Sequence, residues 1–262
     1  MSCAAGANGR AGQAGQAPGT RGDVVLVWWT PQNRRPVVAN VPANVISYRR
    51  RERVIAAGLT SLSGYVDAMG FIALGGYFVS FMSGNSTRLG VGLESAWSKA
   101  ALPAMLIGLF VAGVVLGTLT GQVARSRRPS AVVALVTVLL CAAAIFNDAG
   151  MSSLAVMFMA LAMGAENTVF ERNGEVTIGL TYMTGTLVKL GQRVTSALLG
   201  QGDRFAWAWY LLLWLGLVVG TLVGAAVYNR IGLDGLWFAA LAAAALGVAA
   251  HRYIGADAKP KL

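Results

Sequence analysis

Met82-Ser83-Gly84-Asn85-Ser86-Thr87-Arg88-Leu89-Gly90 recurs in related form as Met183-Thr184-Gly185-Thr186-Leu187-Val188-Lys189-Leu190-Gly191, 101 positions further along the chain. Met, Leu and both glycines are identical in the two copies, and the Ser/Thr and Arg/Lys exchanges are conservative. A second block recurs 103 positions later, with Gly113, Val115, Gly117, Thr118, Leu119 and Gly121 repeated as Gly216, Val218, Gly220, Thr221, Leu222 and Gly224. Two matches in the same order indicate an internal duplication.

The composition around these blocks is that of a membrane protein. Of 262 residues, 56% are hydrophobic and 12% are charged, and the mean hydropathy is +0.60. Soluble domains carry about 25% charged residues, so an ordinary soluble fold is excluded. Six apolar segments follow a polar beginning, at about 54–78, 102–124, 130–146, 151–168, 205–228 and 233–253. We therefore predict an all-α integral membrane protein with about six transmembrane helices.

The duplication predicts how these helices are arranged. Repeat A covers 54–146 and repeat B covers 151–253, with three helices in each. Three is an odd number, so the second copy enters the membrane from the opposite side. The result is a 3+3 inverted repeat, an architecture typical of secondary transporters that bind solute between the repeats.

The charges predict the orientation. The net charge is +10, and the basic residues flank the apolar segments instead of accompanying a nucleic-acid-binding motif, so we expect no nucleic acid. With the N-terminus inside, 18 of the 21 Lys and Arg residues lie on the inner side. The positive-inside rule then places both termini in the cytoplasm. Residues 1–53 are predicted to be a disordered basic tail, and 254–262 a cytoplasmic C-terminal tail.

The two Met-[Ser/Thr]-Gly blocks predict interrupted helices near Gly84 and Gly185. Glycine is unfavourable inside a helix, and Ser83 and Thr184 are suitable N-caps for a short following helix. Two such half-helices could point their amide-rich N-termini at a polar or anionic solute. Arg88 and Lys189 lie one turn further on and would add positive potential. The alternative is a pair of close helix crossings in which small residues let backbones approach and the cations extend to the interface.

Two acids fall inside apolar segments. Asp67 lies well inside the first segment, where a charge is costly and is often functional, so it is a candidate for proton or cation coupling. The alternative is an anchor that caps a broken helix or pairs with Arg88. Aligning Phe71 with Phe170 makes Glu166 the repeat partner of Asp67. Glu166 could instead mark the end of the fourth segment.

Six glycines recur at intervals of four on the second helix of each repeat, namely Gly113, Gly117, Gly121, Gly216, Gly220 and Gly224. Such spacing places three glycines on one helix face, which is typical of close helix packing. We expect these faces to hold the repeat halves together or to form a contact in a homo-oligomer.

Four blocks carry a resemblance to a known family: Gly64–Ala68, Phe78–Asn85, Met163–Asn167 and Thr181–Thr186. Together they resemble the YoaK-type family, small multi-spanning proteins of the bacterial inner membrane, over about Arg53 to His251. The resemblance implies that location but assigns no chemistry to any residue.

The favoured function is transport of a small polar or anionic solute. The alternatives are a channel-like pore and a non-transporting scaffold or lipid-binding protein. No hydrolase or nucleotide-binding motif is present, so we expect neither an enzyme nor a bound metal or cofactor. The expected partners are membrane lipid and the solute. The candidate solute-binding residues are Asp67, Ser83, Gly84, Asn85, Arg88, Glu166, Asn167, Thr184, Gly185, Thr186 and Lys189.

Overall fold

The computed structural model describes residues 25–28, 37–40, 50–172, 175–176, 180–200 and 203–254. The chain divides into two units, Met1–Ser47 and Tyr48–Leu262. In the first unit, β1 (Val25–Trp28) pairs antiparallel with β2 (Val37–Asn40). These two segments are apolar and valine-rich, which favours extended pairing, whereas the sequence predicted a disordered tail over residues 1–53. Residues 50–53 of the predicted tail form the first turn of α1, and the remainder of the tail and most of 254–262 lie outside the described residues.

The second unit is almost entirely helical, which confirms the all-α part of the predicted fold class. Its elements are α1 (Arg50–Ala73), α2 (Met82–Ser95), α3 (Trp97–Ala124), η1 (Arg125–Arg127), α4 (Arg128–Asp148), α5 (Ser152–Glu166), β3 (Glu171–Arg172), β4 (Glu175–Val176), α6 (Met183–Leu198), α7 (Ala206–Ile231), η2 (Gly232–Gly235) and α8 (Leu236–Ile254). Two of these are single-turn 3₁₀ helices, η1 and η2, and β3 with β4 forms a two-residue antiparallel pair.

Three helical stretches of the described chain are long and apolar enough to cross a membrane. They are Arg53–Ala73, Trp97–Asp148 and Ala206–Arg252. The second stretch contains both α3 and α4, and the third contains both α7 and α8. Helix α5 is apolar but shorter, at 15 residues. These helices account for the six predicted apolar segments.

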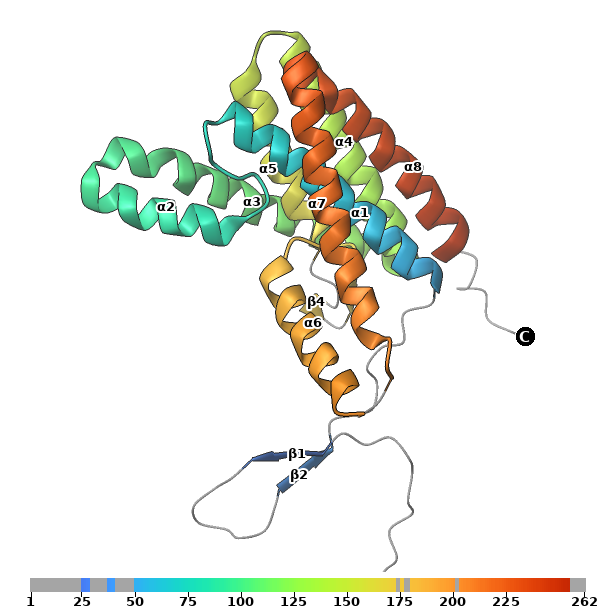
Figure 1. Ribbon diagram of the computed structural model, residues 1–262. Coiled ribbons are helices and arrows are strands. Elements are labelled where there is room, and N and C mark those ends of the chain that lie inside the picture. Colours follow the sequence, from blue (N-terminus) through green and yellow to red (C-terminus); the bar gives the residue numbers. More distant parts are fainter. Residues whose placement is uncertain are drawn as a thin grey trace, which may run out of the picture. The chain divides into compact units, whose positions relative to one another are not determined.

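The helices pack in two equivalent sets. Helix α1 packs on α7 while α5 packs on α3, and α2 and α6 each pack on the helix that follows them. Helix α4 contacts α5 and α8, and α8 also contacts α1. Exchanging α1–α4 with α5–α8 therefore reproduces this pattern of contacts. Figure 1 shows α2 alongside α3, and α6 alongside α7. Each repeat thus consists of three apolar helices and one additional short helix.

The two repeats contact each other through very close approaches between helix backbones, α1 with α7 and α5 with α3. A Cβ atom built on Gly220 of α7 would lie 1.9 Å from the Ser61 carbonyl oxygen of α1. In the other half, Gly113 of α3 would place a Cβ 2.1 Å from the carbonyl oxygen of Leu161, which lies 100 positions after Ser61. Gly113 therefore corresponds to Gly220, and the predicted match of Gly113 with Gly216 is wrong by one helical turn. All six predicted packing glycines lie in tight contacts, although Gly121 faces the Arg128 side chain and Gly216 is the loosest, at 3.3 Å. Five of the six face the opposite repeat.

Helix α1 ends in a turn that only glycine accommodates readily. Gly75 and Gly76 have φ values of 63° and 107°, in the left-handed region where side chains are strained. The Gly76 N–H donates to the Phe71 carbonyl oxygen at 2.7 Å, which closes the last turn. The first apolar segment therefore ends as a helix at Ala73, and the chain returns through Leu74–Phe81 to begin α2.

Candidate functional site

A polar contact joins the first helices of the two repeats. Ser63 of α1 and Glu166 of α5 approach to 2.6 Å, between the Ser63 Oγ and the Glu166 Oε2. Both residues are fully buried, with 0% of their surface exposed. Polar groups in such surroundings are stabilised only when they find partners, so this contact fixes α1 against α5.

Asp67 lies one turn beyond Ser63 on α1 and holds the loop that precedes α2. Its Oδ1 accepts the backbone N–H groups of Val79 at 2.9 Å and Ser80 at 2.8 Å. Val79 and Ser80 are buried, so without Asp67 their amides would lack these partners. Asp67 therefore has the geometry of an anchor, one of its two predicted roles.

Asn167 does the same in the second repeat. Its Oδ1 accepts the Thr181 hydroxyl at 3.0 Å and the Thr181 N–H at 3.4 Å, while its Nδ2 donates to the Met163 carbonyl oxygen at 2.9 Å. Thr181 is the repeat equivalent of Ser80, 101 positions later. Asn167 is therefore the structural counterpart of Asp67.

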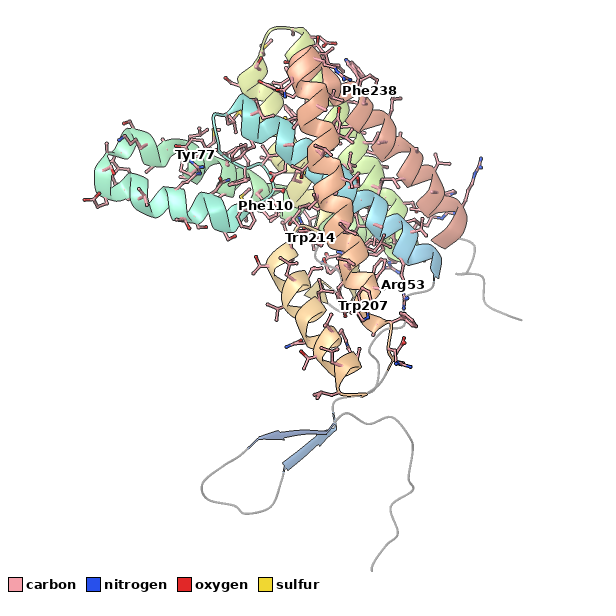
Figure 2. The ribbon with its side chains drawn as sticks, in the orientation of Figure 1. Arg53, Tyr77, Phe110, Trp207, Trp214 and Phe238 are labelled. Atoms are coloured by element: carbon pink, nitrogen blue, oxygen red, sulfur yellow. The ribbon has the colours of Figure 1, made fainter. Side chains whose placement is uncertain are left out.

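The predicted pairing of Asp67 with Glu166 is consequently wrong by one residue. Gly64 and Gly164 confirm that α1 and α5 align 100 positions apart, because both meet the backbone of a neighbouring helix. A Cβ on Gly64 would lie 2.3 Å from the Leu217 carbonyl oxygen of α7. One on Gly164 would lie 2.0 Å from the carbonyl oxygen of Phe110 on α3, which Figure 2 labels. The offset here is 100 positions, which pairs Asp67 with Asn167. One residue turns a helix by about 100°, so the error assigned Glu166 to the wrong face. The pattern Gly-x-x-[Asp/Asn], which occurs at Gly64–Asp67 and at Gly164–Asn167, could have identified this pairing from the sequence.

The starts of α2 and α6 differ from the predicted caps. Phe81 and Tyr182 occupy the N-cap positions and make no side-chain cap hydrogen bond, while Ser83 and Thr184 lie inside the first turn. Asn85 stabilises the start of α2 instead: its Oδ1 accepts the Phe78 N–H at 3.1 Å, and its Nδ2 donates to the Phe78 carbonyl oxygen at 2.6 Å. A side-chain amide carries a separate acceptor oxygen and donor nitrogen, so Asn85 can make both bonds at once.

In α6 the position equivalent to Asn85 is Thr186, which is also buried. Its hydroxyl donates to the Tyr182 carbonyl oxygen at 3.2 Å. Asn85 and Thr186 therefore face the interior at the two helix starts, whereas Ser83, Thr184 and Gly185 are exposed. The structure thus separates the predicted solute residues into an interior group and an exposed group.

Gly84 and Gly185 also have different surroundings. A Cβ on Gly84 would lie 2.7 Å from the Phe81 ring and 2.9 Å from the Phe78 ring, whereas nothing lies within 4 Å of one on Gly185. Phe78 packs edge-on against Phe81 and tilted against Phe71, with ring centroids 5.2 Å and 4.9 Å apart. Gly84 therefore makes room for an aromatic cluster at the start of α2.

The two predicted cations are also placed differently. The guanidinium carbon of Arg88 lies 4.8 Å from the centroid of the Tyr77 ring, which Figure 2 labels beside α2 and α3. A Cβ on Gly76 would lie 3.2 Å from an Arg88 nitrogen, so Arg88 folds back over the loop after α1. Lys189 is exposed on α6. The predicted alternative of an Asp67–Arg88 pair is replaced by two separate interactions, Asp67 with loop amides and Arg88 with an aromatic ring.

An ion pair that the sequence did not reveal joins α4 to the segment after α5. Arg128 pairs with Glu171, and the Nε of Arg128 donates to the Thr168 carbonyl oxygen at 3.2 Å. The Thr118 hydroxyl also reaches Glu171, at 3.4 Å. The partners are 43 residues apart, so no local pattern indicates the pair.

The opposite ends of the helices carry a second group of polar contacts. The Asn147 side chain donates to Asp234 at 2.8 Å, and the Trp237 indole N–H donates to Asp148 at 3.1 Å. These bonds join the end of α4 to η2 and α8. At the beginning of α1, the Arg53 guanidinium lies 5.6 Å from the Trp209 ring of α7, in the region where Figure 2 labels Arg53 and Trp207.

These features define a class: a helical, strongly apolar protein built from a duplicated unit, with buried polar groups where the two copies meet. Comparison with known proteins identifies the family. Residues 55–249 match the family described as "Protein of unknown function (DUF1275)", and the chain belongs to it.

Its relatives are membrane proteins. The chain is 35% identical over 226 residues to "UPF0700 transmembrane protein RA0705" of Rhizobium meliloti (strain 1021), covering 85% of this chain and 94% of the relative. It is 27% identical over 145 residues to "UPF0700 transmembrane protein YoaK" of Bacillus subtilis (strain 168), covering 52% of this chain and 64% of that relative. The predicted resemblance to the YoaK-type family is confirmed, and the chain is a multi-pass transmembrane protein. No solved structure matches it significantly.

Proposed function

We propose that this protein transports a small polar or anionic solute across the bacterial inner membrane. One observation carries the proposal. Asp67 of α1 and Asn167, the C-cap residue of α5, hold the starts of α2 and α6 at equivalent positions, next to the buried Ser63–Glu166 contact between the repeats. Polar, non-helical backbone at membrane depth occurs where protein or a water-filled cavity covers it, and transporters with inverted repeats bind solute at such places.

The proposed topology has six spans in a 3+3 inverted repeat with both termini in the cytoplasm. The contacts at the helix ends support it, because each joins segments that the topology places on one side. Arg53 with Trp209 and Arg128 with Glu171 fall on the inner side. Asn147 with Asp234 and Asp148 with Trp237 fall on the outer side. The basic inner turn Arg125–Arg128 agrees with the positive-inside rule, which counts Lys and Arg.

The proposed solute class follows from the groups near the two helix starts. Helix N-termini carry free amides and a partial positive charge, which favour anions and polar acceptors. Arg88 adds a full positive charge beside the loop at the beginning of α2. Asn85 and Thr186 supply interior polar side chains. The proposal includes no catalytic step and no cofactor; its partners are membrane lipid, the solute and a second copy of the chain.

The second candidate is a channel-like pore, and the third is a scaffold or lipid-binding protein. The Asp67 and Asn167 anchors favour the transporter, because each ties a helix start to the first helix of its own repeat. Alternating access in such transporters moves one repeat against the other, so each helix start would move with its repeat.

Uptake into liposomes separates these functions. We would reconstitute the purified protein and measure uptake of radiolabelled inorganic anions, amino acids, sugars and nucleobases against concentration. A transporter gives saturable uptake that Arg88→Gln reduces at least severalfold and that Arg53→Gln, which also removes an arginine from an aromatic ring, leaves unchanged. Linear uptake without saturation would identify a channel, and the absence of uptake throughout the panel would favour the scaffold.

A further inference from the structure

Glu166 is the buried ionisable group with the least satisfied surroundings in the described part of the chain. Its Oε2 contacts the Ser63 hydroxyl, but its Oε1 has no hydrogen-bond partner. The hydroxyl of Thr60, one turn before Ser63 on α1, is buried without a partner as well. Residues three apart on a helix share a face, so α1 presents two hydroxyls on the side where Ser63 meets Glu166.

The hydrogens available at this contact can be counted. The Ser63 hydroxyl has one proton but two acceptors within reach, the Leu59 carbonyl oxygen at 3.2 Å and Glu166 Oε2 at 2.6 Å. If Glu166 is a carboxylic acid, its O–H donates to Ser63 and Ser63 donates to Leu59, so every proton has an acceptor. If Glu166 is a carboxylate, it accepts a single hydrogen bond and its other oxygen remains bare. A buried carboxylate normally has several donors or an opposite charge.

We propose that Glu166 is a proton-binding site at the contact between the two repeats, and that it holds its proton in the arrangement described here. Because the site lies where α1 of one repeat meets α5 of the other, loss of the proton would favour a different arrangement of the two helices. This inference rests on the proposed transport function for its purpose, but the proton site itself can be tested without a solute.

The ionisable groups around Glu166 do not replace the missing donor. From α1, Asp67 is occupied by the amides of Val79 and Ser80, and the Tyr65 hydroxyl donates to the Gly235 carbonyl oxygen. From α4, Arg128 is bound to Glu171 and to Thr168. Helix α3 meets α5 through glycines, with Gly117 against Ala165. A carboxylate at Glu166 would therefore need a new donor, and the free Thr60 hydroxyl or a water molecule can supply one after a small rearrangement.

The position of Glu166 connects this proton to the solute region. The next residue, Asn167, binds Thr181 at the start of α6. A change at Glu166 can therefore reach α6 through adjacent backbone, and can reach α1 through Ser63. Asp67 was the predicted coupling residue; its role as an amide anchor leaves Glu166 as the group that is free to change its protonation.

Infrared spectroscopy can observe the proton directly. We would record pH-difference spectra of the purified protein and follow the C=O stretch of protonated carboxylic acids, which is separate from carboxylate bands. Wild type is expected to show a buried carboxylic acid band that disappears reversibly as the pH rises. Glu166→Gln should lack the band, while Asp67→Asn and Glu171→Gln should retain it. Ser63→Ala should shift the band to a different frequency, because the carboxyl group loses its partner.

A wild-type spectrum without such a band, a band that does not change over the pH range in which the protein is folded, or a band retained in Glu166→Gln would each overturn the proposal. If Glu166→Gln does not fold, the frequency shift in Ser63→Ala decides. A titrating Glu166 band in a protein that shows no solute uptake would remove the transport function and leave the proton site standing. Solute uptake by a protein that lacks the band would support the transport function and remove the proton site.

Discussion

Asp67 and Asn167 hold equivalent loops with different chemistry. One is an acid and the other an amide, yet each uses its Oδ1 to accept hydrogen bonds from the residues that precede a short helix. The geometry requires an acceptor at this position, and the structure shows that a neutral one is sufficient.

Replacing Asp67 should therefore have graded effects on stability. Asp67→Asn keeps the acceptor and is expected to lower the free energy of unfolding by about 1 kcal/mol. Asp67→Ala leaves two buried amides without partners and is expected to cost about 2–6 kcal/mol, since each orphaned group costs about 1–3 kcal/mol. Thermal unfolding in detergent measures both. Equal losses for the two variants would contradict the anchor and favour a role for the charge itself.

The glycines at helix crossings allow a sharper comparison. In Gly220→Ala the new methyl group would overlap the Ser61 carbonyl oxygen at 1.9 Å, so α7 and α1 must separate, at a cost of about 1–3 kcal/mol or more. Gly185→Ala is the control, because the site is open and alanine favours a helix by about 1 kcal/mol. We expect the melting temperature to fall in the first variant and to stay level or rise in the second. A tolerated Gly220→Ala would argue against the close crossing.

At the scale of elements, α2 and α6 are placed by the loops before them more than by their own first residues. Their N-caps carry no side-chain hydrogen bond, and their sequences suggested Ser83 and Thr184 as caps. The recurring Met-[Ser/Thr]-Gly pattern predicted where the helices begin to within one or two residues. It could not predict the mechanism, because the partners of the loop lie on α1 and α5, distant in sequence.

The two hydrogen bonds between Asn85 and Phe78 should keep the loop before α2 ordered. Asn85→Ala removes both hydrogen bonds to Phe78, so amide exchange at Phe78, Val79 and Ser80 should accelerate by about tenfold or more, equivalent to about 1.4 kcal/mol of lost local stability. Hydrogen–deuterium exchange with mass spectrometry measures this. Ser86→Ala is the control, since its exposed hydroxyl bonds only the Met82 carbonyl oxygen in its own helix. Equal exchange rates in the two variants would show that the Asn85–Phe78 hydrogen bonds are not needed to order the loop.

The Arg128–Glu171 pair joins α4 to the segment after α5 and should contribute to stability. The side chains are only 16% and 11% exposed, so solvent screens the pair less than a surface ion pair. A double-mutant cycle with Arg128→Met and Glu171→Gln is expected to give a coupling energy of about 1–3 kcal/mol. A coupling energy near zero would mean that the Arg128–Thr168 bond alone fixes the arginine.

At the scale of the whole molecule, the sequence predicted the helical class, the six apolar segments and the duplication. These follow from composition and repetition, which are properties of the chain alone. The partner of Asp67 was mispredicted because the offset between the repeats is not constant. It is 100 in α1/α5 and 101 at the starts of α2 and α6, and the glycine contacts place it at 107 in α3/α7. The Ser63–Glu166 and Arg128–Glu171 contacts depend on which helices cross, and repetition does not specify crossings.

The inverted topology can be tested by labelling cysteines. In a Cys3→Ser/Cys141→Ser background, Ser126→Cys in η1 and Ala149→Cys in the α4–α5 turn place exposed thiols at opposite ends of α4. We expect a membrane-impermeant maleimide to label Ala149→Cys in intact cells, and Ser126→Cys only after the inner membrane is permeabilised. Labelling of both positions from one side would contradict the span between them, and the reverse pattern would invert the orientation.

The most direct test of a solute site between the repeats is ligand-induced stabilisation. We would measure the melting temperature of the purified protein against small anions, amino acids, sugars and nucleobases. A ligand at about 100 times its dissociation constant stabilises by about 2.7 kcal/mol, enough to raise the melting temperature by several degrees. We expect such a shift in wild type and in Arg53→Gln, and its loss in Arg88→Gln. A shift that persists in Arg88→Gln, or no shift with any compound, would contradict a solute site between the repeats that includes Arg88.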